Sequence, residues 1–453
     1  MTQFNDEELC LFAVKLGDIE NRIDTHFYLP EYQKITKKIQ GQERYTTIGA
    51  IAKFSNETTN YSEFKEGVFE YLEISGVELG TTHYRTSSTA VEDAPSRAKM
   101  KTQKGDIAIS TTRPHRGAIV EIKDDNIIAS TGFAIVREID NSINEKWLLH
   151  TLLSRAVLQQ FLQRSSGGNY PAIVIDEVKN VYIPFLNEHK QQSMVELIES
   201  SLTKKNKTIS LANYELDKFN NLVSEIFNLS RETTRRLCYA IKLKHLDGVI
   251  DAKRYASFRD TNHTISIFDV CDIVDKKVNV SQYGERTIDW IRIDDLPNQP
   301  LDIEDVRTQP ANTIEGTFFE VQEGDILVAR LGPTILNKKI VMVRSVKRTT
   351  IASAEFLVLR CKPEYNPEAV MAVLKTDYYK ELMYSHARGS TPSRYRLNRE
   401  DMLTLPFPDI REHQEELAIE ANTVREQVKT MRIQAEQEWQ AAKAQFEKEL
   451  LGE

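Results

Sequence analysis

Asp176, Glu177 and Lys179 are the residues of this sequence that come nearest to a catalytic group. Nucleases hold Mg²⁺ between carboxylates to activate water, and a short acidic stretch with a nearby lysine could belong to such a site. The sequence offers no second acidic partner that can be placed beside it. We therefore expect an exposed acidic turn that leads into a strand over residues 181–183, and a stand-alone Mg²⁺-dependent nuclease remains the alternative.

Other catalytic signatures are absent from the sequence. It has no phosphate loop ending in Gly-Lys-Ser/Thr, no Gly-x-Gly-x-x-Gly turn, no His-Glu-x-x-His pair and no Gly-x-Ser-x-Gly elbow. The Asn/Asp-Pro-Pro-aromatic tetrapeptide of amino-methyltransferases is missing as well. The nine histidines and four cysteines are dispersed, without a Cys-x-x-Cys pair. We predict that the chain is not an enzyme and binds neither a metal nor a cofactor.

Clusters of basic residues indicate a different chemistry. Residues 97–116 hold six basic residues against one acid, and residues 338–348 and 388–399 hold five and four without an acid. Cationic loops bind phosphates, and guanidinium and amide groups read base edges, so these stretches favour contact with double-stranded DNA. The predicted DNA-binding residues are Lys99, Lys101, Arg113, Arg116, Asn169, Tyr170, Arg330, Lys338, Lys339, Arg388, Ser390, Arg394 and Arg396.

The sequence repeats itself once. Residues 12–16 match residues 239–243, Gly105-Asp106-Ile107 matches Gly324-Asp325-Ile326, and residues 168–171 match residues 389–392, all at offsets between 219 and 227. Matches in one order at nearly one offset predict the tandem duplication of a domain with an appendage. The basic loops of the two copies differ in sequence, which predicts two different DNA half-sites rather than a palindrome.

Each copy begins with strand and turn signals. Short alternating apolar runs, such as residues 106–110, 118–121 and 131–136, are separated by Gly, Asn and Asp. One helix is predicted within each series, over residues 145–164 and 367–384, because leucines and other apolar residues recur there at helical spacing. Each copy is therefore expected to be a mixed α/β domain.

After each domain the apolar period changes to seven, which predicts two helices of about 40 residues that pair as an antiparallel coiled coil. In the second helix the apolar spacing changes from about 3.5 toward 3.6 residues at Trp439, Ala442 and Phe446. The C-terminal end of this helix should therefore pack differently from the rest of the coiled coil. The fold class expected is α+β: a tandem pseudo-two-fold repeat of two mixed α/β domains separated by the two long helices. The predicted seam consists of Val195, Ile198, Leu202, Ile209, Leu216, Phe219 and Val223 in the first helix and Leu417, Val424, Val428 and Met431 in the second.

The acidic charge of the whole chain does not oppose contact with DNA. The formal net charge is -8, but residues 411–453 contribute -4 and residues 5–31 contribute -5, so everything between them sums to +1. The acidic ends are available to protein partners. The longest apolar run, residues 369–374, is far shorter than the roughly 20 residues of a membrane span, and the first residues lack signal-peptide features. We expect no membrane contact and a cytoplasmic location.

The order of these pieces resembles the specificity (S) subunit of type I restriction-modification enzymes. The resemblance covers nearly the whole chain, and the pieces that carry it occur once in each half. It is carried by Arg22-Ile23-Asp24 with Tyr28, by Gly105-Asp106-Ile107, by Gly168-Asn169-Tyr170-Pro171, and by residues 178–184 followed by Gln191-Gln192 and a long helix.

The resemblance implies a DNA-reading subunit without catalysis. Each α/β unit would be a target recognition domain for half of a split site, and the helices would form a spacer and bind two methyltransferase (M) subunits. S-adenosylmethionine, ATP and Mg²⁺ would belong to partner subunits, and whether restriction (R) subunits take part stays open. The implied divisions are an N-terminal segment over 1–19 that completes the symmetric helical region, recognition domains over 20–185 and 247–408, a spacer helix with its connector over 187–246, and a C-terminal spacer helix over 410–453.

A second alternative comes from a different class of protein. A scaffold could use the same α/β domains for protein partners and the coiled coil for assembly, without binding DNA. Binding to DNA that moderate salt abolishes, together with a sequence preference, would separate recognition from scaffolding.

Overall fold

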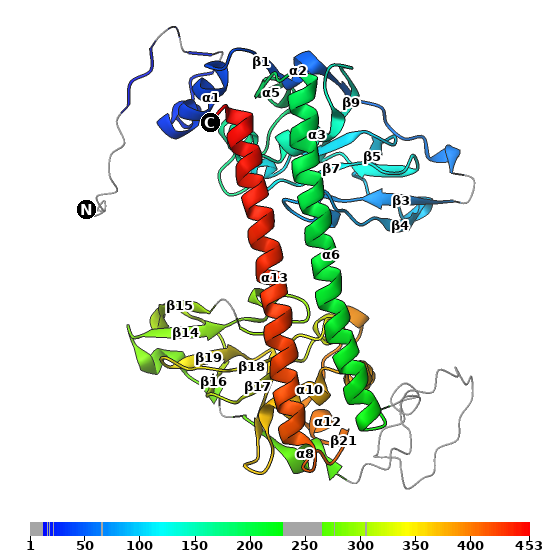
Figure 1. The fold of residues 1–453 in the computed structure, drawn as a ribbon, viewed down its shortest axis with the longest axis vertical. Helices are drawn as coiled ribbons and strands as arrows, with labels where there is room; N and C mark the ends of the chain where they lie inside the picture. The colour runs from blue at the N-terminus through cyan, green and yellow to red at the C-terminus, as the bar shows by residue number, and fades with distance from the viewer. Residues whose placement is uncertain are drawn as a thin grey trace. The chain divides into compact units, whose positions relative to one another are not determined.

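The computed structural model describes residues 12–15, 17, 19–20, 22–64, 67–229, 265–275, 277–303 and 306–453. The chain forms two compact units: unit 1 comprises Met1–Asn206 with Glu436–Glu453, and unit 2 comprises Lys207–Ala435 (Figure 1). Both units combine strands and helices, which confirms the predicted α+β class. The predicted connector from residue 230 onward and most of the segment over 1–19 lie outside the described residues.

Unit 1 contains two four-stranded sheets and a separate pair of strands. The first sheet has the order β2-β9-β6-β7 and is antiparallel throughout, whereas the second, β4-β3-β8-β5, contains the parallel pair β3·β8. The strands are β1 (Tyr45–Thr47), β2 (Ala52–Ser55), β3 (Val68–Leu72), β4 (Ser87–Ala90), β5 (Ala98–Lys101), β6 (Ile107–Ser110), β7 (Ile119–Glu121), β8 (Ile127–Ser130), β9 (Phe133–Ile139) and β10 (Tyr182–Pro184), of which β1 and β10 pair with each other.

Unit 2 repeats this topology. Its sheets have the orders β12-β20-β17-β18 and β13-β16-β19-β14-β15, with β14·β19 parallel, and β11 pairs with β21. Apart from the added β13, each strand has a counterpart in unit 1, as the duplicated sequence predicts. The strands are β11 (Ile265–Ser266), β12 (Cys271–Ile273), β13 (Lys277–Val278), β14 (Thr287–Ile291), β15 (Arg307–Pro310), β16 (Phe318–Val321), β17 (Ile326–Ala329), β18 (Ile340–Met342), β19 (Thr350–Ser353), β20 (Phe356–Cys361) and β21 (Pro406–Phe407).

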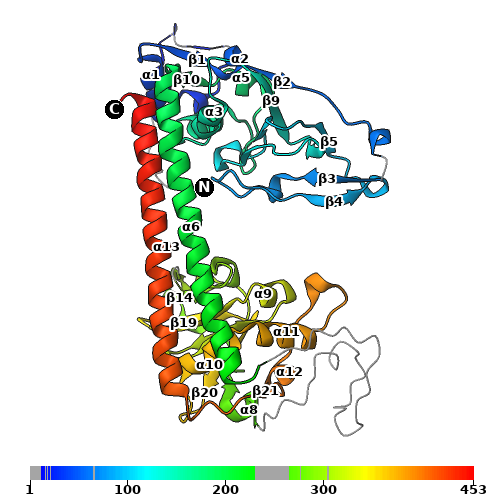
Figure 2. The same cartoon turned by 45° about the vertical axis from the view of Figure 1, so that its right-hand side comes forward.

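The helices complete each unit, and Figure 2 shows them from a second side. Among the described residues, no helix has both the length and the apolar composition needed to cross a bilayer. The helices of unit 1 are α1 (Pro30–Gln40), α2 (Ile48–Ile51), α3 (Glu145–Leu152), α4 (Arg155–Arg164) and α5 (Ile175–Lys179); those of unit 2 are α8 (Ile267–Val270), α9 (Gly332–Leu336), α10 (Pro367–Leu374), α11 (Asp377–His386) and α12 (Arg399–Leu403); α6 (Glu188–Ile226) and α13 (Gln414–Leu451) each contribute to both units.

The expectation of one helix over 145–164 and one over 367–384 is wrong, because each is broken in two. The Ser154 hydroxyl accepts a hydrogen bond from the Val157 backbone N–H and caps α4, and Thr376 caps α11 in the same way. A hydroxyl that satisfies a free N–H starts a new helix at that point. Apolar spacing continues across both breaks, so it did not reveal them.

The repeated Gly-Asp-Ile motif is explained by an ion pair between a buried aspartate and a partly exposed arginine. Asp106 is 3% exposed and accepts hydrogen bonds from Arg137 Nε at 2.9 Å and from Arg137 Nη2 at 2.7 Å. In unit 2, Asp325 is fully buried and makes the same two bonds with Arg360, at 2.8 and 2.9 Å. The preceding glycines have positive φ angles of 91° and 90°, which favour glycine. The motif therefore fixes the start of β6 and of β17.

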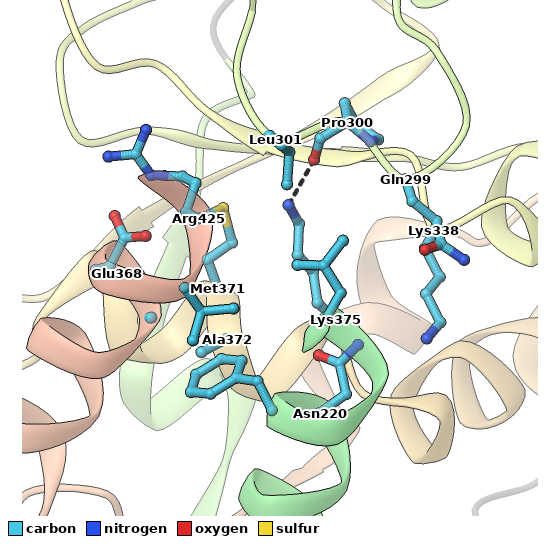
Figure 3. A pocket seen from close by; sticks show the side chains of 14 residues that line it. Asn220, Gln299, Pro300, Leu301, Lys338, Glu368, Met371, Ala372, Lys375 and Arg425 are labelled. Carbon is cyan, nitrogen blue, oxygen red and sulfur yellow. Dashed lines mark hydrogen bonds between the residues drawn. The ribbon is translucent and has the colours of Figure 1, made fainter. Parts of the chain in front are cut away.

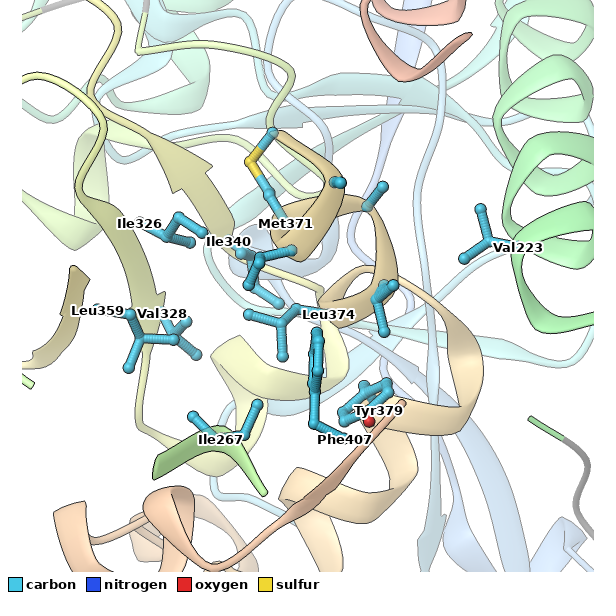
Figure 4. Packing of buried hydrophobic residues seen from close by; sticks show 14 of the residues in the cluster. Val223, Ile267, Ile326, Val328, Ile340, Leu359, Met371, Leu374, Tyr379 and Phe407 are labelled. Atoms are coloured by element: carbon cyan, nitrogen blue, oxygen red, sulfur yellow. The ribbon is translucent and has the colours of Figure 1, made fainter. Parts of the chain in front are cut away.

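Several apolar clusters make up the core of each unit, and the largest of them includes residues of both a sheet and the helices. Figure 4 shows part of the unit 2 core, where Ile326 and Val328 of β17 lie with Leu374 of α10 and Phe407 of β21. In unit 1 the equivalent cluster gathers Ile107 and Ile109 of β6 with residues of α3 and α4. Burial of these side chains stabilises the framework by roughly 1.5–3 kcal/mol for each large residue.

In each unit α6 and α13 pack side by side (Figures 1 and 2). The start of α6 meets the end of α13 in unit 1, where Lys205 pairs with Glu436, and the end of α6 meets the start of α13 in unit 2. The two helices are therefore antiparallel. Trp439, Ala442 and Phe446 join the core of unit 1. Of the predicted seam, Val195, Ile198, Phe219, Val223, Leu417, Val424 and Val428 are buried, and Leu202, Ile209, Leu216 and Met431 are half-buried.

A glutamine fastens the start of each long helix to its α/β domain. The Gln191 side-chain oxygen accepts a hydrogen bond from the Asn144 backbone N–H at 2.7 Å, and Gln414 accepts the equivalent bond from Asn366 at 2.8 Å. Asn144 and Asn366 in turn cap α3 and α10. The recurring glutamine that follows each domain therefore sets where the long helix leaves it.

We expect Arg360→Met to lower the free energy of unfolding of unit 2 by about 3 kcal/mol. The substitution leaves the buried Asp325 carboxylate without its cationic partner, and uncompensated buried charges are costly. Arg307→Met is the matched control, because Arg307 makes a similar two-bond contact with Asp295 at the surface and should cost less than about 1 kcal/mol. Urea unfolding measures both; equal losses would contradict this account.

Candidate nucleic-acid interface

Two loops of unit 1 lie side by side where β6 ends. The Arg113 backbone N–H donates to the Pro171 carbonyl at 2.7 Å, and Thr112 pairs with Ala172 as an isolated bridge. Arg113 has a φ angle of 49°, in the left-handed region that non-glycine residues rarely adopt. The turn after β6 and the loop between α4 and α5 therefore form one surface feature, which we call loop pair 1 (residues 111–117 and 166–172).

Three predicted DNA-binding residues meet in loop pair 1. The Arg113 guanidinium carbon lies 4.1 Å from the centre of the Tyr170 ring, and Arg113 Nη2 donates to the Asn169 carbonyl at 3.3 Å. Tyr170 is 70% exposed, so its ring is accessible from solvent. A guanidinium stacked on an exposed ring can contact a phosphate or a base edge while the ring stacks on a base.

The local charge at loop pair 1 is positive. Arg116 is exposed in the short 3-10 helix Pro114–Arg116. Burial lowers the pKa of His115, and the charges of Arg116 and Arg113 lower it further, so this imidazole is neutral at pH 7. Lys99 and Lys101 lie on β5 of the other sheet, where Lys99 is exposed and Lys101 half-buried.

Unit 2 has the equivalent arrangement, loop pair 2 (residues 330–332 and 388–396). Leu331 pairs with Arg396, and the Gly332 backbone N–H donates to the Tyr395 carbonyl at 2.7 Å. A Cβ atom on Gly389 would lie 2.4 Å from the Arg394 carbonyl oxygen, so the close backbone approach requires glycine there. Both recurring turn motifs, at 168–171 and 389–392, thus contribute to a loop beside the end of the corresponding strand.

Most cations of loop pair 2 are held by acids or amides. Arg388 pairs with Asp401 at 3.1 Å, Arg396 pairs with Glu355 at 2.8 Å, and Arg330 donates to the Asn398 side chain at 3.4 Å. The Arg394 backbone N–H donates to the Thr391 carbonyl, but its exposed side chain makes no hydrogen bond or ion pair with the described part of the chain, and Ser390 is exposed nearby in sequence. Arg394 is therefore the cation of loop pair 2 that is freest to bind a phosphate or base.

Two predicted DNA-binding lysines serve the framework in this structure. Lys338 is 5% exposed, and its ammonium group pairs with Asp377 at 3.0 Å. Lys339 donates to the Ile293 carbonyl at 3.0 Å. The partners of both lysines lie about 40 residues away in sequence, so the basic run itself did not reveal them. The Lys338 ammonium in particular has little surface to offer a phosphate.

The carboxylates considered for a nuclease site are engaged in ion pairs. Asp176 is largely exposed and pairs with Lys179 at 2.9 Å, whereas Glu177 accepts from Arg164 at 2.9 Å. These residues lie in the short helix α5 rather than in the turn that we expected. Among the described residues, no three His, Cys, Asp or Glu side chains gather closely enough to hold a metal ion. The geometry gives Glu177 a packing role beside the buried Arg164.

A small cavity of unit 2 lies beside α10 (Figure 3). It measures about 50 Å³, room for a few waters but far below the roughly 300 Å³ of a typical ligand pocket. Lys375 donates to the Pro300 carbonyl at 2.7 Å within it, and burial lowers the pKa of this lysine to about 8. The cavity belongs to the packing of α6, α10 and α13.

Part of the sequence is similar to a known protein. No family model matches the sequence. Over 156 residues, 34% of this chain, the sequence is 29% identical to the specificity subunit of the type I restriction enzyme HindI from Haemophilus influenzae. About a third of the chain is therefore similar in sequence to a type I specificity subunit. This confirms the resemblance that the motif order indicated, although the match spans only 33% of the relative's length.

Solved structures of specificity subunits are similar over most of the chain. Those from Thermoanaerobacter tengcongensis and M. genitalium are 17% and 14% identical, cover 90% and 91% of this chain and 96% and 98% of their own, and give TM-scores of 0.38 and 0.39. A chain from a study of complex assembly in the type I R-M system is 17% identical over 90% of this chain and 96% of its own, with a TM-score of 0.45. All three scores lie below 0.5, so the description of the fold rests on this chain's own residues.

We expect Arg394→Ala to weaken DNA binding by about 1–3 kcal/mol if Arg394 reads a base. If Arg394 contacts only a phosphate, binding should weaken equally for all sequences, and the salt dependence should decrease by about one ion. Lys277→Ala removes another exposed cation of unit 2, on β13, and serves as the control. Fluorescence anisotropy at several salt concentrations measures both variants; an unchanged affinity and salt slope for Arg394→Ala would remove this residue from the interface.

Proposed function

We propose that this chain is the DNA-recognition subunit of a type I restriction-modification complex. The observation that carries the proposal is the pair of equivalent loop surfaces on two duplicated units, which present different side chains. These are the half-buried Arg113 with the exposed Tyr170 in loop pair 1, and the exposed Arg394 in loop pair 2. Equivalent frameworks that present different groups suit the reading of two different half-sites. The sequence relationship to a type I specificity subunit supports the same function.

The two long helices act as a spacer in this proposal. Helix α6 has 39 residues and α13 has 38, so each is roughly 57 Å long at 1.5 Å per residue. The number of unread base pairs between the half-sites would then follow from the helix length. A geometric spacer explains why both helices are fastened to their domains through Gln191 and Gln414.

Catalysis belongs to partner subunits in this proposal. Two methyltransferase subunits, with or without restriction subunits, would supply the chemistry of S-adenosylmethionine, ATP and Mg²⁺. The acidic segments over residues 5–31 and 411–453 would face these partners. A nuclease activity of this chain itself is disfavoured because Glu177 is neutralised by Arg164 and Asp176 by Lys179. A scaffold without DNA binding does not require the exposed Arg113–Tyr170 stack.

Selection from randomised duplexes tests the proposed recognition. The full chain, purified with its methyltransferase partner, should enrich two short, different sequence elements separated by a spacer of fixed length. Enrichment of one element, of a palindrome, or of none would contradict bipartite reading. Cleavage of DNA by the chain alone in Mg²⁺ would instead support the nuclease.

Deleting one heptad from α6 and one from α13 at the boundary between the units tests the spacer. Seven residues shorten a helix by roughly 10 Å, equal to about three base pairs of B-DNA. We expect the selected spacer to shorten while both sequence elements stay the same. Replacing the same heptads by others of equal length is the control, and an unchanged spacer in the deletion variant would reject the helical ruler.

A further inference from the structure

Two of the four cysteines, 90 residues apart in the sequence, face each other in unit 2. Cys271 begins β12 and Cys361 ends β20, and the register of this antiparallel pair places them directly opposite. Their sulfur atoms lie 3.5 Å apart. Both are free thiols in the structure.

The hydrogen-bond pattern of the two strands favours closure of this pair. The Lys362 backbone N–H donates to the Val270 carbonyl, and the Val274 N–H donates to the Val358 carbonyl. Residues 270, 272 and 274 therefore form hydrogen-bonded pairs with residues 362, 360 and 358 of the opposite strand. Cys271 and Cys361 therefore form a non-hydrogen-bonded pair. At such pairs the Cα atoms are about 4.5 Å apart and the side chains are closest, within the Cα range of disulfides. Disulfide formation therefore needs only a rotation of the two cysteine side chains that brings the sulfur atoms together.

The two thiols are not equivalent. Cys271 is fully buried, whereas Cys361 is half-buried at the surface. The hydrogen bond with Cys361 and the burial both raise the pKa of the Cys271 thiol. Cys361 is therefore the thiol that a dissolved oxidant reaches first, and Cys271 is placed to react with it afterward. The equivalent strands of unit 1, β2 and β9, contain no cysteine.

We propose that Cys271 and Cys361 form a thiol-oxidation site at which a hydroperoxide produces an intramolecular disulfide. The Cys361 thiolate takes one oxygen from the hydroperoxide, which breaks the O–O bond, leaves an alcohol or water, and makes a sulfenic acid. The Cys271 sulfur then attacks the Cys361 sulfur, and hydroxide leaves as water with the Cys271 proton. Two thiols lose two electrons in total, and the hydroperoxide accepts both.

The disulfide would fasten the strand that supports loop pair 2. Helix α12, which directly follows this loop pair, packs against β12, and Arg399 at its start forms an ion pair with Asp275 just after β12. A cross-link between β12 and β20 closes a long loop of the unfolded chain and so stabilises unit 2 against unfolding. Unit 1 would be unaffected, so oxidation acts on one of the two duplicated units.

Peptide mapping of the full chain after hydrogen peroxide treatment and alkylation with N-ethylmaleimide tests the proposal. Wild-type protein should lose two alkylatable thiols and yield a cross-linked peptide that joins Cys271 to Cys361. Melting of unit 2 should shift upward by on the order of 5 °C, and a reductant should reverse the shift. In Cys271→Ala, Cys361 should stop at the sulfenic acid, which dimedone traps.

The double variant Cys10→Ser with Cys238→Ser is the matched control and should form the same cross-linked peptide. The proposal fails if folded wild-type protein keeps both thiols alkylatable after peroxide. It also fails if each thiol is oxidised further without cross-linking, or if the cross-link joins Cys10 or Cys238 instead. Because the decisive measurement uses wild-type protein, it does not depend on how well the variants fold.

Discussion

The ion pair between a buried aspartate and an arginine is the interaction on which the rest of each unit depends. Asp106 and Asp325 sit at the starts of β6 and β17, where Arg137 and Arg360 hold both carboxylate oxygens. These are central strands, each paired on both sides. Their far ends lead directly into loop pairs 1 and 2. The ion pair therefore sets where a strand begins, and the strand's fixed length sets where its loop emerges.

A second constraint governs how the long helices join the domains. An isolated helix of α6's composition could point in many directions from a domain, but Gln191 ties its first turn to the N-terminal cap of α3. Asn366 and Gln414 repeat this junction in unit 2. In each unit, one asparagine thus caps a helix of the α/β domain with its side chain and positions the long helix with its backbone N–H. In each unit, the hydrogen bond from the asparagine backbone to the glutamine side chain fixes the start of the long helix on its domain, as the proposed spacer requires.

Periodicity and repetition predicted the framework because both can be read directly from the order of the residues. Alternating runs predicted β6, β7 and β9, and the heptads predicted α6 and α13. The breaks at Ser154 and Thr376 were missed, since the apolar spacing continues through them. Contacts between distant residues were also beyond the sequence: nothing near Lys338 signals Asp377, and nothing near Cys271 signals Cys361. Whether the predicted DNA-binding residues contact DNA stays a prediction.

The duplication separates residues that must stay the same from residues that are free to differ. The framework groups recur in both units: the buried aspartate, its arginine, the helix-capping asparagine and the glutamine beneath it. The surface groups do not recur. Loop pair 1 presents an arginine stacked on a tyrosine, and loop pair 2 presents Arg394, whose side chain has no partner among the described residues. Since the backbone bridges that join the loops are made by main-chain atoms, the exposed side chains can change without disturbing them. Under the proposed function, one framework would therefore carry two specificities, and a change of specificity would require only new side chains on the loops.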